Sequence, residues 1–407
     1  MLPLPVEIHS EILSWLGLDV KSIAAWASVN KDLHDASIAA LYNAVPSSAL
    51  LTLSQPASQC SADFAPAVRS IFIMPTKEDG NSLGLKTITL LREVWQKLAN
   101  RSNIRGFHWM VEDSLVLIFP SGVPQSLQHL STLEMHVNVY SSENIYYLMQ
   151  LMTENLTVVH LHFNKDCEQE SPHSIVNILR NLGYKTPWLV DLQLTFPAIM
   201  KQDSIEGLKS LLQSNDFLFP KLISLGLSSW NTQLPCLDLL QHHTFVIHLC
   251  YRWAGIRTEN TTLFTNENRF HDLQHFRGSL FDVRRLLYFP PPHPNLQSID
   301  VALYNFTSIA YVFERLTSTT TLKHLTLRNF VAITEFDACL IGCLSTLKEL
   351  TFIPDTCVPT HDILVHLKAI IPRMSHLTTF TTSLPVTTPL PTVLTNFFAQ
   401  IQPPRGL

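Results

Sequence analysis

The sequence has little charge and little glycine. Only 15% of its 407 residues are charged, the formal net charge is -5, and there are 12 glycines. Positive residues are scattered rather than gathered into a stripe, so the electrostatic footprint of a nucleic-acid-binding protein is missing. The sequence has no glycine-rich phosphate loop and no dinucleotide-binding fingerprint. These absences argue against nucleic acid as a partner and against nucleotide cofactors.

Cysteine and long apolar runs are also scarce. The seven cysteines are odd in number and irregularly spaced, which disfavours a secreted disulfide framework and favours a reducing compartment. No apolar run reaches the roughly 18 residues of a membrane span, and the N-terminus lacks the basic and apolar segments of a signal peptide. We therefore expect no membrane partner, and a location in the cytoplasm, the nucleus or both.

No group of residues has the spacing of a catalytic or metal site. His160 and His162 share one face of a predicted strand, but no third or fourth metal ligand accompanies them. Cys339 and Cys343 lie one helical turn apart and, with Cys357, are better explained as apolar positions. We predict no metal, no cofactor and no catalytic residue, hence a protein that is not an enzyme. The remaining hypothesis, an unrecognised hydrolase or transferase, would require a deep polar pocket.

The first 45 residues carry apolar side chains at steps of three and four, the pattern of short amphipathic helices. Pro3 and Pro5 prevent a helix from starting before about Val6, and Gly17 closes that helix. Asp19 can cap a second helix, and a third follows. Three such helices form a very small core, which needs a neighbour to bury its remaining apolar face.

This stretch resembles an F-box, in the version found at the N-terminus of many fungal, basidiomycete-type F-box proteins. The matching pattern is Leu-Pro-x-Glu-Ile-x-x-x-Ile-Leu-x-x-Leu, then Asp-Val-x-x-Ile, Val-x-Lys and Leu-Tyr-x-x-Val. Leu33 departs from the pattern, because the family often has an aromatic residue there. The resemblance implies that the helices bind a Skp-type adaptor and, through it, a cullin. The adaptor-binding residues that it implies are Leu4, Pro5, Ile8, Ile12, Leu13, Leu16, Ile23 and Val29. The alternative is a plain helical cap on the following domain.

A repeat follows a Ser-, Ala-, Gln- and Pro-rich stretch at 46–66, which we predict to be a linker with room for one short strand. From 67 to 385 the unit apolar-x-x-apolar-x-apolar recurs, which is typical of a strand with alternate residues pointing inward. The central residues of its copies are Ile71, Phe107, Leu133, Val159, Leu192, Leu225, Leu249, Phe276, Ile299, Leu325, Leu350 and Phe380. The intervals run from 23 residues (Phe276 to Ile299) to 36 residues (Ile71 to Phe107). Most lie near the period of leucine-rich repeats.

Helix patterns lie between these strands, for example at 141–153 and after Asp203-Ser204-Ile205-Glu206, which has the form of a capping box. The alternation resembles the leucine-rich-repeat family in an irregular form. The predicted fold is therefore α/β: a three-helix F-box at 1–45, then an irregular leucine-rich-repeat solenoid with a parallel sheet on its concave face and helices outside. Residues 386–407 are expected to form a C-terminal cap and tail.

Residues beside the inward-pointing ones face the opposite side of a strand. This alternation selects the candidate target-binding residues Glu134, His136, His160, His162, Arg252, Arg277, Asp300 and Arg328. Guanidinium groups suit anions, so the three arginines favour an acidic or phosphorylated segment, and the alternative is a set of solvated strand residues.

The two resemblances together imply a substrate-recognition (F-box) subunit of an SCF-type cullin ubiquitin ligase, with the repeats binding an unknown protein target. The alternative is a leucine-rich-repeat interaction scaffold outside any ligase. The two hypotheses differ in whether Leu4, Pro5, Ile8 and Leu13 are exposed or are buried against the first repeats.

Overall fold

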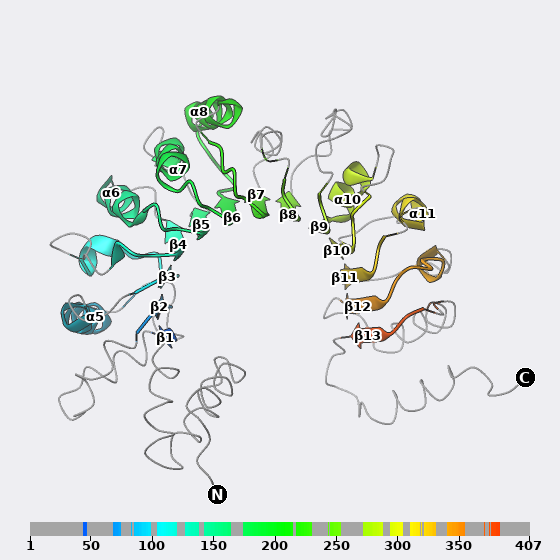
Figure 1. Ribbon diagram of the computed structural model, residues 1–407. Helices are drawn as coiled ribbons and strands as arrows, with labels where there is room; N and C mark the ends of the chain where they lie inside the picture. The colour runs from blue at the N-terminus through cyan, green and yellow to red at the C-terminus, as the bar shows by residue number, and fades with distance from the viewer. Residues whose placement is uncertain are drawn as a thin grey trace, which may run out of the picture. The chain divides into compact units, whose positions relative to one another are not determined.

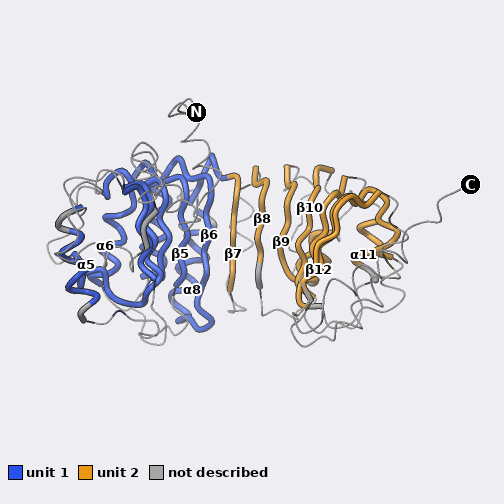
Figure 2. Tube along the Cα trace, turned by 90° about the horizontal axis from the view of Figure 1, so that it is seen from below, with its two compact units in different colours: residues 1–222, 233–235 blue, residues 223–232, 236–407 orange. Residues whose placement is uncertain are grey.

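A computed structural model of the chain shows parallel strands alternating with helices (Figure 1). It describes residues 44–46, 68–74, 83, 85–98, 104–119, 127–137, 142–163, 174–214, 217–229, 243, 245–253, 272–287, 294–303, 310–317, 319, 321–330, 340–354, 370, 374 and 376–382. The chain divides into two compact units, unit 1 (1–222 and 233–235) and unit 2 (223–232 and 236–407), coloured blue and orange in Figure 2. Among the described residues, no helix combines the length and the apolar character needed to cross a membrane.

Unit 1 contains parallel strands in chain order. They are β1 (Ala44–Pro46), β2 (Ser70–Ile73), β3 (Gly106–Trp109), β4 (Thr132–Val137), β5 (Val158–Phe163) and β6 (Asp191–Phe196). Each strand pairs with the next, and the register aligns Ile71, Phe107, Leu133, Val159 and Leu192 side by side. These are the predicted central residues of the repeat, so the pattern correctly located β2 to β6, whereas β1 was not predicted.

Unit 2 continues the same alternation with its own parallel strands. They are β7 (Ser224–Ser229), β8 (His248–Trp253), β9 (His275–Ser279), β10 (Ser298–Ala302), β11 (His324–Phe330), β12 (Glu349–Pro354) and β13 (Thr379–Thr382). The predicted central residues again align from strand to strand, from Leu225 and Leu249 through to Leu350 and Phe380. The predicted α/β class, with a parallel repeat, is confirmed for the described residues.

The helices of each unit cover one face of its strands (Figure 1). Unit 1 has α5 (Leu85–Leu98), the 3-10 helix η3 (Leu115–Leu117), α6 (Ser142–Leu151), α7 (Ser174–Lys185) and α8 (Gln202–Gln213), and unit 2 has α10 (Leu280–Leu286) and α11 (Ala310–Thr317). Inward strand residues such as Leu133, Leu161 and Leu192 are fully buried beneath them. The described helices lie on one face of the strands, so they do not cover the side chains of the opposite face.

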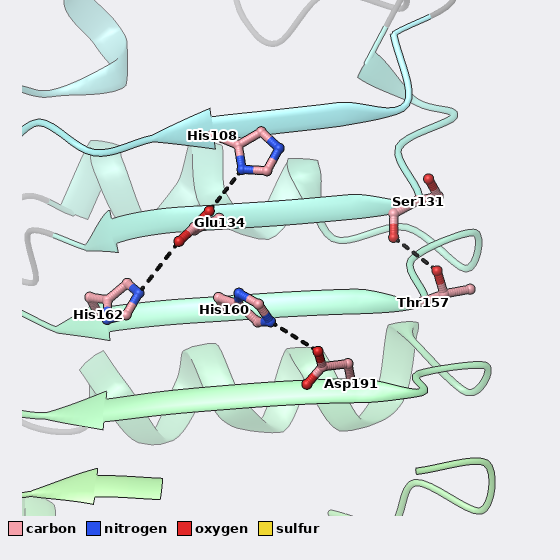
Figure 3. A network of polar contacts seen from close by, with 7 residues as sticks. All are labelled: His108, Ser131, Glu134, Thr157, His160, His162 and Asp191. Atoms are coloured by element: carbon pink, nitrogen blue, oxygen red, sulfur yellow. Dashed lines mark hydrogen bonds and ion pairs between the residues drawn. The ribbon is translucent and has the colours of Figure 1, made fainter. Parts of the chain in front are cut away.

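A repeated backbone turn sets the strand register. The N–H groups of Ser131 and Thr132 both donate to the Arg105 carbonyl, at 2.8 and 2.9 Å. The hydroxyl of Thr157 in turn donates to the Ser131 carbonyl at 3.2 Å (Figure 3). Equivalent pairs of N–H donors precede strands of unit 2. The turn satisfies the polar backbone groups at the start of each strand, and it holds neighbouring strands at the same height.

Helix starts differ from the prediction in one place. The capping box expected at Asp203–Glu206 is wrong, because α8 begins at Gln202 and Asp203 therefore lies inside its first turn. A capping box instead begins α10. The carboxylate of Asp282 accepts from the Ser279 N–H at 3.0 Å, and the Asp282 N–H donates to the Ser279 hydroxyl oxygen at 3.3 Å. Asp203–Glu206 and Ser279–Asp282 have the same three-residue spacing. Only the observed start of each helix shows that the second segment forms a capping box and the first does not.

Several predictions concern residues outside the described part of the chain. They include the F-box helices with all of the implied adaptor-binding residues, the linker apart from Pro46, the C-terminal segment 386–407, Cys339 and Cys357. Strand β1 spans the predicted boundary between the F-box and the linker, and it pairs in parallel with β2. The F-box-like motif therefore runs directly into the first strand of unit 1.

Candidate functional site

The face of each sheet opposite its helices carries mostly polar side chains, and we call it the open face. In β4, β5 and β6 the residues alternate strictly between buried positions beneath the helices and half-buried positions on the open face. Glu134, His136, His160 and His162 all lie on this face, as the strand alternation predicted. The residues that the sequence selected in unit 1 therefore share one surface.

Imidazole and carboxylate groups meet at the centre of the unit 1 open face. We call this group the histidine–carboxylate cluster, and its members are His108, Glu134, His136, His160, His162 and Asp191. Nδ1 of His108 lies 2.8 Å from Oε2 of Glu134, and Nε2 of His162 lies 3.9 Å from Oε1 of the same carboxylate (Figure 3). Nε2 of His160 lies 3.3 Å from Oδ2 of Asp191. Four adjacent strands, β3 to β6, thus contribute to one polar network.

Neighbouring side chains hold these imidazoles in place. The ring of His108 stacks on Phe72, with centroids 3.9 Å apart and planes 11° from parallel. His162 lies edge-on to His136 at 5.3 Å, and its Nδ1 lies 3.1 Å from the Thr195 hydroxyl. The strand register dictates these contacts, because it pairs Phe72 with His108, and His162 with both His136 and Thr195.

The cluster strongly favours the ionised form of Glu134. Hydrogen bonds from His108 and then His162 hold the pKa of this carboxyl far below its usual range, against the opposing effect of burial. Burial instead lowers the pKa of His136, and the positive charge that His162 can carry lowers it further. At neutral pH the Glu134 carboxylate is therefore a permanent negative charge and an obligate hydrogen-bond acceptor.

We expect Glu134→Gln to remove part of the acid sensitivity of the fold. Because the folded-state pKa of Glu134 lies below its unfolded value, its stabilising effect is present above about pH 4.3 and is lost as the pH falls further. The wild type should therefore be more stable than the variant near about pH 7, and the difference should shrink progressively as the pH falls from about 4.3 toward the much lower folded-state pKa. Urea unfolding of both proteins across this range measures it. Glu206→Gln, on the exposed side of α8, is the control, and parallel pH curves for wild type and Glu134→Gln would contradict the expectation.

Two of the three arginines of unit 2 that were predicted to favour an acidic segment contact an acidic side chain. Asp300 lies between two of them: Nε of Arg328 is 2.6 Å from its Oδ1, and Nε of Arg277 is 3.4 Å from its Oδ2. Arg252 lies on β8, in register with Ser228. Asn329, next to Arg328, has a positive φ of 52° at a shift in the β11–β12 register. The carboxylate of Asp300 therefore offsets part of the positive charge that favoured an acidic partner.

A row of histidines on unit 2 was not predicted from the sequence. His248 and His275 stack with centroids 4.4 Å apart, and Nδ1 of His324 lies 2.9 Å from Oε2 of Glu349. Burial lowers the pKa of His275, and the nearby His248 and His324 contribute to the same shift. These residues lie immediately before the predicted central residue of their strands, as does Asp191. The sequence analysis selected only the open-face positions that follow the central residue, so it missed the position before it.

The described residues contain no group of three or more potential metal ligands in a metal-binding arrangement. Cys343, which was expected at an apolar helix position, is exposed, and so it does not pack in the core. His108 was also missed, although it stands between the inward-pointing Phe107 and Trp109, where the alternation identifies it.

No protein-family model matches the chain, and no curated protein matches it. Among solved structures, the chain is similar to one in the crystal structure of the Rad7 and Elc1 complex in yeast. The similarity covers 88% of this chain and 90% of that chain, with 14% sequence identity and a TM-score of 0.41. Similarity at this level leaves the function to be inferred from the residues of the chain itself.

Proposed function

We propose that this chain is the substrate-recognition subunit of an SCF-type cullin ubiquitin ligase. In this proposal residues 1–45 bind a Skp-type adaptor and, through it, a cullin, while the open faces of the repeats bind a protein target. The observation that carries the proposal is the F-box-like motif, whose final Leu-Tyr-x-x-Val runs into β1 of a parallel repeat array. In this proposal the F-box-like motif and the open faces of the repeats would be the two separate binding surfaces that a receptor needs.

The chain itself contributes binding and not chemistry in this proposal. It would act by holding the target close to a conjugating enzyme carried by other subunits, so that proximity replaces a catalytic group. The polar open faces suit such a role, because a non-obligate interface has about the polarity of an ordinary protein surface. The proposed location is the cytoplasm, the nucleus or both.

Co-expression with a Skp-type adaptor, followed by gel filtration, tests the proposal. We expect the wild-type chain to elute with the adaptor at equal stoichiometry. A Leu4→Ala, Pro5→Ala, Ile8→Ala variant should lose the complex, because apolar anchors supply most of the binding energy of such interfaces. The matched control is Tyr184→Ala with Trp188→Ala, which also removes large side chains, here at positions exposed by 85% and 58% on the repeat array.

The two outcomes separate the two hypotheses. A complex that the triple variant loses and the control retains supports the receptor. A folded wild-type chain that elutes without the adaptor contradicts it and leaves the interaction scaffold, in which the N-terminal helices only cover the first repeats.

A further inference from the structure

The described open face of unit 1 combines carboxylates with imidazoles and carries no lysine or arginine on its strands. The strand positions on this face are Ser70, Phe72, Gly106, His108, Thr132, Glu134, His136, Val158, His160, His162, Asp191, Gln193 and Thr195. Arg69 and Arg105 directly precede β2 and β3 in the chain. With neutral imidazoles, the strands of this face therefore present only negative formal charge.

The two carboxylates determine which nitrogen of each paired imidazole carries the proton. A carboxylate only accepts hydrogen bonds, so Nδ1 of His108 donates to Glu134 and Nε2 of His160 donates to Asp191. A neutral imidazole carries one proton, so its other nitrogen is an acceptor: Nε2 on His108 and Nδ1 on His160. The side chains of His108 and His160 are 13% and 20% exposed, so each ring is reached from the open face only in part.

We propose that the open face of unit 1 binds a lysine- and arginine-rich segment of the protein target at neutral pH and releases it when the imidazoles protonate. The face offers two partly exposed carboxylates, Glu134 and Asp191, and an acceptor nitrogen on each of the two paired imidazoles. The stacked rings of Phe72 and His108 add a flat surface on which a guanidinium group can pack. This inference rests on the proposed function only in assigning the segment to a ligase target.

Protonation reverses the character of this face. A protonated imidazole has a donor at both nitrogens, so His108 and His160 would lose their acceptors and gain a positive charge that repels a cationic segment. The charged and titratable groups around them are Glu134, His136, His162 and Asp191, with Glu112 also acting on His136. The test therefore compares binding at about pH 7.5 with binding at about pH 5.5, on the two sides of the pKa of free histidine.

Fluorescence anisotropy of the full chain with a labelled peptide of alternating arginine and serine tests the proposal. At about pH 7.5 we expect the wild type to bind this peptide in preference to one of alternating glutamate and serine. Glu134→Gln with Asp191→Asn should weaken binding about tenfold, as should a shift of the wild type to about pH 5.5. The charge-matched control is Asp203→Asn with Glu206→Gln on α8, which removes the same formal charge from the helical side and should leave binding unchanged.

A second variant tests the protonation step. Glutamine reproduces the donor and the acceptor of a neutral imidazole but cannot gain a proton, so His108→Gln with His160→Gln should bind the arginine peptide equally at both pH values. Circular dichroism of each variant verifies that it is folded.

Three results would overturn the proposal. One is equal weakening by the α8 control, which would indicate a general effect of net charge. The second is preference for the glutamate peptide, and the third is binding that requires zinc and disappears with a chelator. Adaptor binding is a separate readout. An adaptor complex that ignores the arginine peptide refutes this inference alone, whereas peptide binding without adaptor binding refutes the ligase function alone.

Discussion

Replacing Leu161 by alanine is expected to lower the free energy of unfolding by about 3–4 kcal/mol. Leu161 is fully buried at the centre of β5, beneath the helices of unit 1. The change removes buried methyl groups and leaves a cavity between a strand and its helix, which the two neighbouring strands prevent from collapsing. Urea unfolding followed by circular dichroism measures the loss.

His162→Ala, one residue further along the same strand, is the matched control. This side chain lies on the open face and is 30% exposed, so its removal should cost about 1 kcal/mol or less. Comparable losses for the two variants would contradict the assignment of these neighbours to opposite faces. A small cost for His162→Ala would also show that the open face can be altered without unfolding the protein, as the binding experiments require.

Replacing Gly278 by alanine is expected to destabilise unit 2 by about 1–3 kcal/mol. An added Cβ would lie 2.9 Å from the backbone carbonyl oxygen of Tyr251 and 2.8 Å from the ring of Phe276. Neither the carbonyl of β8 nor the buried ring can move away freely, so the two strands would be forced apart. Thermal and urea unfolding of the full chain measure the effect.

Gly106→Ala provides the comparison for this variant. Its added Cβ would lie 2.5 Å from the hydroxyl oxygen of Ser70, a side-chain atom that can rotate away. The loss should therefore be smaller, and Ser70→Gly in the same chain should largely restore stability. Equal losses for Gly106→Ala and Gly278→Ala would mean that the close approach of strand backbones at Gly278 does not limit the packing of unit 2.

The strand positions were predictable because the repeat imposes its own register. Each repeat has apolar residues at the central position, at the third position before it and at the second position after it, and all of them must face the helices. A shift of the strand pairing by one residue would turn all of these side chains to the open face. Hence the pairing of Leu133 with Val159, or of Leu325 with Leu350, followed from the pattern alone.

The partners of the polar side chains were not predictable in the same way. Arg277 and Arg328 were expected to be available for an anion, but Asp300 engages both, since the register brings three strands together at that point. His108 and Asp191 were overlooked although they complete the cluster around Glu134 and His160. An ion pair between residues some 26 to 31 positions apart leaves no mark in the local sequence, because only the stacking of repeats brings such residues together.

The sequence by itself determined the α/β class, the location of strands β2 to β13 and, in strands such as β4, β5 and β6, the face on which each alternating side chain lies. These properties depend on hydrophobic periodicity, which is local and is repeated along the chain. Only the tertiary structure decided which imidazole contacts which carboxylate, which arginines are neutralised and where the helices begin. Those outcomes depend on distances across neighbouring strands and on competition between partners, and both are established only when the repeats stack.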